Sequence, residues 1–250
     1  MTRPIVLFDL DDTILDFHQA EKLAIAKTLK DMGIEPEDGV IRRYSEINAR
    51  QWKRLETGEI SREQVLVGRF EILFKELGVD CSSTQAKAAY EIYLSQGHFF
   101  IPGAEELLKK LQGDFRLFIC SNGTAVVQAG RLKSAGIAPY FEEIFISEDV
   151  GYNKPSVEFF ERCFARIKDF DRDRCIIIGD SLSSDILGGI NAGIRTCWFN
   201  PRHKTRSDEI VPDFELGELN QVPELLKRVF YFYKIVQKFV FNSHCKFFCG

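Results

Sequence analysis

Five short apolar runs constrain the fold of this chain most strongly, because each is continuous rather than alternating. A strand that is apolar at every position has both faces covered, which is typical of a parallel sheet between helices. Helical patterns follow the later runs, and this alternation predicts an α/β fold with a doubly wound, Rossmann-like parallel sheet. The runs are Ile5–Phe8, Leu117–Cys120, Ile144–Ile146, Ile176–Ile178 and Thr196–Phe199, and the helical patterns are Gly103–Leu111, Ala125–Ala135, Ser156–Ile167 and Ser184–Ala192.

One interval between the first and second runs has no strand-like segment and is helical in pattern throughout. We expect an all-helical cap domain inserted there, over residues 16–96. The core then comprises residues 1–15 and 97–228, and residues 229–250 form an aromatic-rich C-terminal extension. The expected cap helices are one marked by Leu23, Ala24, Ala26 and Leu29, then Tyr44–Leu55, Glu63–Leu77 and Gln85–Leu94, with breakers at Gly33, Pro36, Gly39, Gly58 and Gly78.

Composition excludes few functions, but it indicates the expected partners, the state of the cysteines and the cellular location. The formal net charge of -4 gives no general field for a polyanion, so a nucleic-acid polymer is not an expected partner and any phosphate needs a local site. The seven cysteines include no CxxC pair and are expected to be reduced and mostly buried. The first apolar run stops at Asp9, too early for a signal peptide, and no stretch is long enough to span a membrane. We therefore expect a cytoplasmic protein, either a monomer or a weak homo-oligomer.

The C-terminal segment from Leu225 to Phe241 is rich in Phe and Tyr and places Lys234, Gln237 and Lys238 at helical spacing. Contact of an amphipathic helix with a membrane or a partner, a docking extension, and a terminus without a dedicated role all remain open.

Polar clusters follow four of the five strand-like runs. They are DLDDT from Asp9, SNG from Ser121, GYNKP around Lys154, and GDSLSSD around Asp180 and Asp185. Each cluster alone is also compatible with an ordinary turn or helix cap. The carboxyl ends of parallel strands meet at one edge of a sheet, however, so together the clusters predict a single pocket.

These residue types suit phosphoryl transfer. Asp9 stands directly at a strand end, where a carboxylate can attack phosphorus and form an acyl phosphate. Asp11 can point into the same pocket if the backbone coils after Asp9, and there it can serve as general acid and base. Mg²⁺ prefers carboxylates, phosphate and water, with Mn²⁺ as a possible substitute. The expected metal residues are Asp9, Asp11 (through a nearby backbone carbonyl), Asp180 and Asp185, and the expected phosphate-binding residues are Ser121, Asn122, Gly123 and Lys154.

With these motifs in order, the chain resembles the haloacid dehalogenase superfamily from about Pro4 to Leu226. The resemblance implies nucleophile Asp9 and acid/base Asp11, and it adds Thr13, the last residue of the first motif, to the expected phosphate-binding set. It also implies that the helical insertion closes over the core and selects substrate. Dehalogenases lack the second catalytic aspartate and sugar phosphomutases usually have glycine in place of Asp12, so the first motif is similar to that of a phosphatase.

A narrower resemblance connects INARQWKRLETGEISREQVLVGRFE, SEDVGYNKP and SDILGGINAGIRTCWFN to the noncanonical pyrimidine 5'-nucleotidase branch. It implies a nucleoside 5'-monophosphate substrate whose base contacts the cap. The candidate cap residues are Phe17, Asn48, Trp52, Arg69 and Phe70, each of which could equally pack in the cap core. Two alternatives stay open: a small sugar-phosphate or phosphoglycolate phosphatase, and a regulatory protein that retains the fold.

Overall fold

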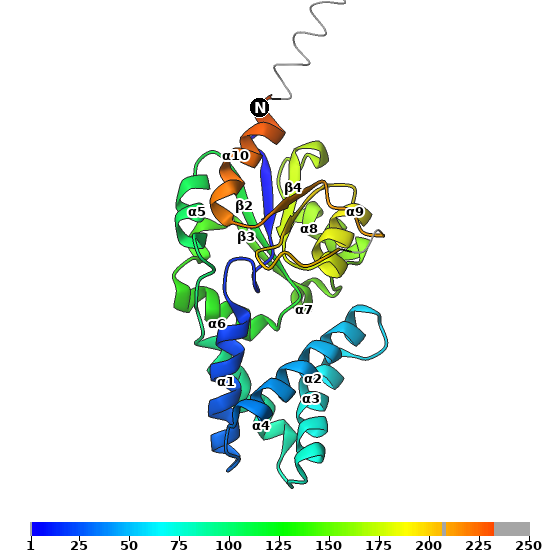
Figure 1. The fold of residues 1–250 in the computed structure, drawn as a ribbon. Helices are drawn as coiled ribbons and strands as arrows, with labels where there is room; N and C mark the ends of the chain where they lie inside the picture. Colours follow the sequence, from blue (N-terminus) through cyan, green and yellow to red (C-terminus); the bar gives the residue numbers. More distant parts are fainter. Residues whose placement is uncertain (1, 207–208, 233–250) are drawn as a thin grey trace, which may run out of the picture.

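Six parallel strands form one sheet in the order β3-β2-β1-β4-β5-β6 in the computed structural model, which describes residues 2–206 and 209–232 (Figure 1). The first strand lies in the middle of the sheet, between β2 and β4, with Ile5 opposite Arg116 and Cys175. The strands are β1 (Ile5–Phe8), β2 (Arg116–Ser121), β3 (Glu143–Ile146), β4 (Cys175–Gly179), β5 (Arg195–Phe199) and β6 (Phe214–Leu216).

Helices cover both faces of this sheet. Val6 and Phe8 of β1 pack in an apolar cluster with α5 and α10, whereas Ile5 and Leu7 pack on the opposite face with α8. This arrangement explains why the strands are apolar at successive positions, and it confirms the predicted doubly wound fold. The core helices are α5 (Ala104–Leu111), α6 (Ala125–Ala135), α7 (Ser147–Val150), α8 (Val157–Arg166), α9 (Leu187–Asn191) and α10 (Val222–Lys227), with the shorter turns η1 (Ala138–Tyr140), η2 (Arg172–Arg174), η3 (Leu182–Ile186), η4 (Leu219–Gln221) and η5 (Arg228–Phe232).

The sixth strand was not predicted from the sequence. β6 pairs with β5 at the edge of the sheet, and its three residues are half-buried or exposed. An edge strand of this length, with Glu215 between two apolar residues, leaves no continuous apolar run to detect.

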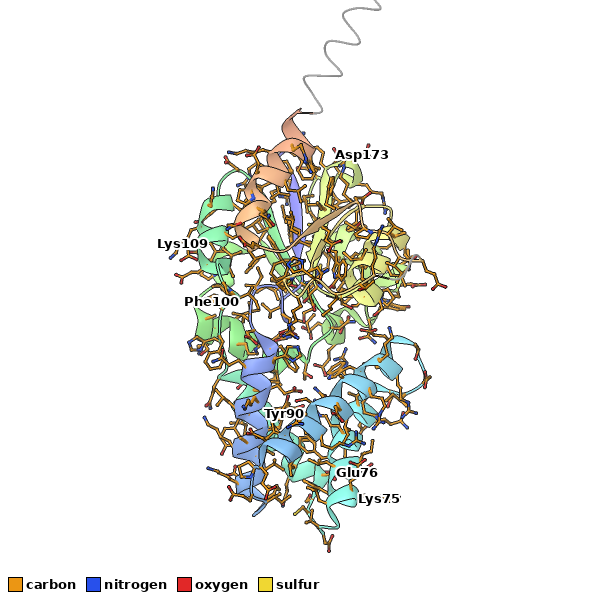
Figure 2. The ribbon with its side chains drawn as sticks, in the orientation of Figure 1. Lys75, Glu76, Tyr90, Phe100, Lys109 and Asp173 are labelled. Atoms are coloured by element: carbon orange, nitrogen blue, oxygen red, sulfur yellow. The ribbon has the colours of Figure 1, made fainter. Side chains whose placement is uncertain are left out.

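Four helices between β1 and β2 pack on one another around an apolar cluster separate from those of the sheet. Figure 1 shows them, blue to cyan, as a second body beside the core. Tyr44, Phe70 and Tyr90 form the centre of this cluster, with ring centroids 5.2–5.8 Å apart, and Figure 2 shows Tyr90 between the helices. Burying the ring of Phe70 stabilises the cluster by roughly 1.5–3 kcal/mol. The helices are α1 (Phe17–Asp31), α2 (Asp38–Glu56), α3 (Arg62–Leu77) and α4 (Ser83–Ser95).

One predicted breaker was wrong. Gly39 lies in the first turn of α2, which begins at Asp38, rather than between two helices. The limits 16–96 for the cap stay a proposal.

The aromatic C-terminal segment falls mostly beyond the part of the chain that the structure describes. The turn η5 reaches Phe232, and the predicted positions Lys234, Gln237 and Lys238 lie outside the described residues. Within the described residues, no helix is both long and apolar enough to cross a membrane.

The close packing of α9 on the sheet generates a stability prediction. A Cβ atom on Gly189 would lie 2.6 Å from the side chains of Ile177 and Thr196, whereas a Cβ atom on Gly39 would meet nothing within 4 Å. We expect Gly189→Ala to destabilise the protein by about 1–3 kcal/mol through overpacking. Gly39→Ala should instead stabilise it by about 0.5–1 kcal/mol, because alanine restricts the unfolded chain and favours the helix. Thermal unfolding of both variants tests this, and a stabilising Gly189→Ala would contradict the packing described here.

Candidate active site

The chain turns sharply after β1 and brings two aspartates to one cavity. The backbone N–H groups of Ile14 and Leu15 both donate to the carbonyl of Leu10, at 3.0 and 2.9 Å, which coils the segment back on itself. Asp9, whose N–H still bonds to Ile178 of β4, and Asp11 then line the same cavity. The coil that the sequence analysis required for Asp11 is therefore present.

Lys154 lies at the centre of the site. Its ammonium group is buried and donates three hydrogen bonds: to Asp9 Oδ1 at 2.6 Å, to Asp185 Oδ1 at 2.6 Å and to the carbonyl of Cys120 at 2.5 Å. All three of its protons are used. One cation thus joins the end of β1, the end of β2 and the turn after β4.

The charged groups in this cluster shift the pKa values of one another. Burial raises the pKa of Asp9 well above its usual value; the nearby carboxylates of Asp185, Asp11 and Asp180 add to the shift, and Lys154 opposes it. Burial lowers the pKa of Lys154, but the negative charges of Asp185 and Asp9 outweigh burial and raise it overall. The site therefore holds more negative charge than Lys154 neutralises, and it favours a further cation or bound protons.

Three carboxylates offer a site for that cation. Oxygen atoms of Asp9, Asp180 and Asp185 lie within 4.8 Å of one another, which fits the carboxylate and oxygen donors that Mg²⁺ prefers. Both oxygens of Asp185 are already engaged, by Lys154 and by the N–H of Ser181, so Asp185 is better placed to orient the group than to bind metal directly. Burial and the charges of Asp185 and Asp12 raise the pKa of Asp180 to about 7.

Asp11 is held by two side chains of α6. Arg131, which is fully buried, donates to Asp11 Oδ1, and Gln128 Nε2 donates to Asp11 Oδ2 at 2.6 Å and to Ser121 Oγ at 3.0 Å. These donors fix the direction of the Asp11 carboxyl group. Its side chain is not part of the three-carboxylate group, which leaves its backbone carbonyl as the proposed contribution to metal binding.

The loop after β2 is locked to the loop that carries Lys154. The Asn122 side chain accepts from the N–H of Lys154 and donates to its carbonyl, both at 2.8 Å, and the N–H of Gly123 donates to Ser121 Oγ at 3.1 Å. A Cβ atom on Gly123 would lie 2.2 Å from Gln128 Nε2. Glycine is thus required where the loop passes the side chain that orients Asp11.

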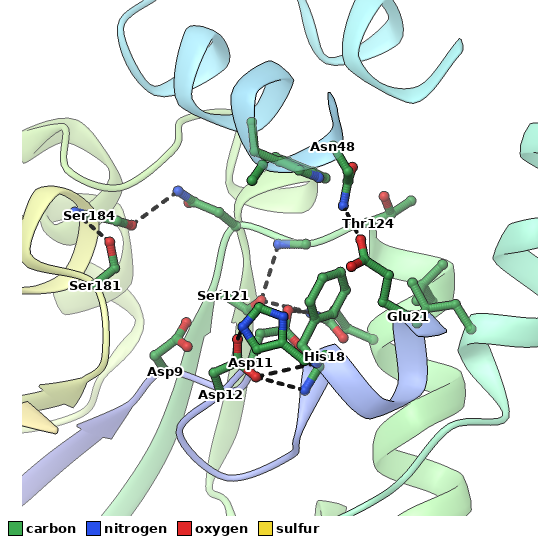
Figure 3. Close-up of a pocket in the computed structure, with 18 of the residues that line it drawn as sticks. Asp9, Asp11, Asp12, His18, Glu21, Asn48, Ser121, Thr124, Ser181 and Ser184 are labelled. Carbon is green, nitrogen blue, oxygen red and sulfur yellow. Dashed lines mark hydrogen bonds and ion pairs between the residues drawn. The ribbon is translucent and has the colours of Figure 1, made fainter. Parts of the chain in front are cut away.

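A cavity of about 370 Å³ joins this edge of the sheet to the cap. Figure 3 shows Asp9, Asp11 and Asp12 on one side of it and Asn48 on the other, with Asn48 linked to Glu21. The volume is within the range of small-molecule sites.

Most of the predicted residues line this one cavity, and two do not. Thr13 is fully buried beneath the loop and does not line the cavity, and its hydroxyl finds no hydrogen-bond partner in the described residues, so its role in binding phosphate stays a prediction. Phe70 packs on Tyr44 and Tyr90 in the cap core, which corrects its expected place at the substrate. The residues at the cavity are Asp9, Asp11, Ser121, Asn122, Gly123, Lys154, Asp180, Asp185, Phe17, Asn48, Trp52 and Arg69.

Sequence reasoning missed several residues of the cavity wall. Gln128 and Arg131 lie within the predicted helix Ala125–Ala135, and two long polar side chains three positions apart among apolar residues were a usable signal. His18 pairs with Asp12 at 3.2 Å, and Glu21 is a buried carboxylate on α1. No local motif marks either of them.

Comparison with known proteins supports the same interpretation of the motifs. A family model for haloacid dehalogenase-like hydrolases matches residues 4–193. The chain is 40% identical over 221 residues to the HAD-hydrolase YfnB of Bacillus subtilis, covering 88% of this chain and 94% of YfnB. A crystal structure of YfnB, described as bound to magnesium and as revealing interdomain movement, superposes with a TM-score of 0.86 and covers 90% of this chain and 99% of that one.

Two further relatives are named as pyrimidine 5'-nucleotidases. The pyrimidine 5'-nucleotidase PynA of Streptococcus pneumoniae is 36% identical over 224 residues, which are 89% of this chain and 94% of PynA. The pyrimidine 5'-nucleotidase YjjG of Escherichia coli is 31% identical over 221 residues, which are 88% of this chain and 96% of YjjG.

The raised pKa of Asp180 generates a prediction for metal binding. In the metal-free protein its protonated form favours folding, and that contribution is lost as the pH rises through about 7. Mg²⁺ binds the carboxylate and displaces the proton. Saturating Mg²⁺ should therefore raise the melting temperature more at pH 8 than at pH 6. Asp180→Asn, which resembles the protonated form, should show a small shift at both values. An equal Mg²⁺ shift at both pH values in the unchanged protein would contradict the assignment.

Proposed function

This chain belongs to the haloacid dehalogenase-like hydrolases, and from that premise we propose that it hydrolyses phosphomonoesters through an aspartyl phosphate on Asp9. The observation that carries the proposal is the contact of Lys154 with Asp9 and Asp185 beside Asp180, at the edge of the sheet where Asp11 also lies. We propose pyrimidine nucleoside 5'-monophosphates as the preferred substrates.

In the first step a carboxylate oxygen of Asp9 attacks phosphorus while the ester oxygen leaves. Lys154 holds the other side of the carboxylate in place and reduces its repulsion with the anionic substrate. Protonated Asp11 donates its proton to the leaving alcohol. The hydroxyl of Ser121, which accepts a hydrogen bond from the N–H of Gly123, donates to the phosphoryl oxygens.

In the second step water attacks phosphorus and the bond to Asp9 breaks, which releases inorganic phosphate. Asp11, now a carboxylate, takes the proton from that water, and its contacts with Arg131 and Gln128 hold its side chain in place. Mg²⁺ held by Asp9 and Asp180 would supply positive charge against the phosphoryl oxygens in both steps.

The cap side of the cavity supports a nucleoside substrate. Asn48 Nδ2 donates to Glu21 Oε1 at 2.7 Å, and Asn48 Oδ1 accepts from Arg69 at 2.9 Å, so α1, α2 and α3 present a connected row of polar groups. All three side chains are buried. Phe17 and Trp52 line the same cavity. Neighbouring donors and acceptors fit the edge of a base, and aromatic rings fit its face.

The catalytic assignment predicts a graded loss of activity. Asp9→Asn should abolish Mg²⁺-dependent hydrolysis of p-nitrophenyl phosphate, because the amide cannot form the acyl phosphate. Asp11→Asn should lower the rate by roughly 10²–10⁴-fold, the usual contribution of a general acid and base. Asp16→Asn is the control, since asparagine can still cap α1 as Asp16 does. Activity that survives Asp9→Asn would refute the nucleophile.

The proposed contact of Asn48 with the base predicts a loss of substrate affinity that depends on which substrate is used. Asn48→Ala should raise KM for uridine 5'-monophosphate by roughly 10-fold, the effect of losing one or two hydrogen bonds. Its KM for p-nitrophenyl phosphate, which has no base edge, should change little. Steady-state kinetics on both substrates measure this, and melting curves check folding. Equal losses on both substrates would show a structural role for Asn48, and better turnover of phosphoglycolate than of nucleotides would argue against a nucleotidase.

A further inference from the structure

Arg62, on the cap, binds three segments of the core. Its Nη1 donates to the carbonyls of Asn122 at 3.0 Å and Gly123 at 3.1 Å. Its Nη2 donates to Ser147 Oγ at 2.5 Å and to Asn153 Oδ1 at 2.7 Å. One guanidinium thus contacts the loop after β2, the start of α7 and the residue before Lys154.

The position of Arg62 on the cap is well fixed. It is the first residue of α3, where Ser61 and Gln64 form a reciprocal capping box. Its guanidinium also lies over the ring of Trp52 on α2, 5.6 Å from the centroid. The capping box fixes the backbone at the start of α3. The contact with Trp52 reduces the freedom of the long Arg62 side chain, so less entropy is lost when it binds the core.

Few other hydrogen bonds join this side of the cap to the core. In the described residues, α2 and α3 bond to core residues through the four contacts of Arg62 and through Ser183, whose hydroxyl donates to Glu56 at 3.1 Å. On the opposite side of the cavity α4 packs against α6. Separation of α3 from the core would therefore break the contacts of Arg62 while α4 and α6 could stay together.

The carbonyls that Arg62 binds belong to peptide groups of the proposed phosphate loop, residues 121–124. The carbonyl of Asn122 shares a peptide group with the N–H of Gly123, and the carbonyl of Gly123 shares one with the N–H of Thr124. A charged donor on such a carbonyl polarises the peptide and makes its N–H a stronger donor. The same contacts hold both peptide planes in one orientation. The N–H of Gly123 donates to Ser121 Oγ at 3.1 Å, so its effect on a phosphoryl group passes through that hydroxyl.

The charge of Arg62 is not cancelled by a bound carboxylate. Its four acceptors are neutral oxygens, and Glu148, the nearby acid, has one carboxylate oxygen occupied by the N–H of Ala125. Half-buried beside the loop, the guanidinium adds positive charge where a phosphoryl group would bind.

We propose that Arg62 is a positioning residue, which brings the cap onto the loop of residues 121–124 and holds the hydrogen-bond donors of that loop in place for the phosphoryl group. This inference rests on the proposed phosphatase function only in naming phosphate as the group bound. Arg62 acts through the loop and is not itself a catalytic residue.

Binding of inorganic phosphate in the presence of Mg²⁺, measured by calorimetry, tests the proposal without turnover. Arg62→Gln should weaken phosphate binding by roughly 10- to 100-fold, as expected for lost charge-assisted hydrogen bonds. Arg62→Lys, which keeps the charge but not the forked geometry, should give an intermediate loss. Arg54→Gln is the matched control, because Arg54 bonds to Gln51 and Glu59 within the cap, and it should bind phosphate as the unchanged protein does. Unchanged affinity in Arg62→Gln would overturn the proposal.

A second measurement excludes a merely structural role. Millimolar guanidinium should partly restore phosphate binding to Arg62→Ala, whereas a variant that had lost its fold would not recover. Absence of rescue together with a lowered melting temperature would count against positioning.

Hydrolysis of p-nitrophenyl phosphate by the same proteins separates the two proposals. If the unchanged protein binds phosphate in a manner that depends on Arg62 but cleaves no phosphomonoester, the proposed function fails and the role of Arg62 stands. If Arg62→Gln cleaves the ester at the unchanged rate, the role of Arg62 fails and the function stands.

Discussion

The buried ammonium of Lys154 is the interaction on which the rest of the site depends. It bonds to Asp9, Asp185 and the carbonyl of Cys120, and so holds together strand ends that would otherwise bring like charges into contact. Removing one partner from such a cluster leaves buried charge uncompensated, which is costly. The packing of Asp185 in this cluster also leaves no room for a side chain at position 179: a Cβ atom on Gly179 would lie 2.3 Å from Asp185. The fold thus provides a local site of high charge density in a protein with a small net charge.

The cap completes this site from the other side. Glu21, Asn48 and Arg69 form a buried polar row opposite the aspartates, and Arg62 contacts the loops that surround Lys154. These cap residues act on different parts of a substrate. The polar row faces the proposed base, whereas Arg62 acts on the proposed phosphate loop. A division of this kind lets the core keep one chemistry while the cap selects what is brought to it.

The fold and the core of the site could be predicted from sequence because strand patterns locate the sheet edge. Asp9 and Asp180 directly follow buried strands and Ser121 ends one, so their positions depend on topology alone. Residues on helices could not be placed in this way. Phe70 and Trp52 have similar character, yet one packs in the cap core and the other lines the cavity, because a small rotation about a helix axis separates the two outcomes. Arg62 and Arg131 act across long sequence separations, which no local pattern records.

The central claim is that Asp9, set between Lys154 and a divalent cation, receives the phosphoryl group. A crystal structure of the protein with Mg²⁺ and beryllium fluoride, which mimics an aspartyl phosphate, tests this most directly. The account predicts beryllium bound to a carboxylate oxygen of Asp9, with Lys154 beside it, Mg²⁺ on Asp9 and Asp180, and fluorides facing Ser121 and the amides near Gly123. Beryllium fluoride on Asp11 or another carboxylate, with Asp9 unmodified, would contradict it.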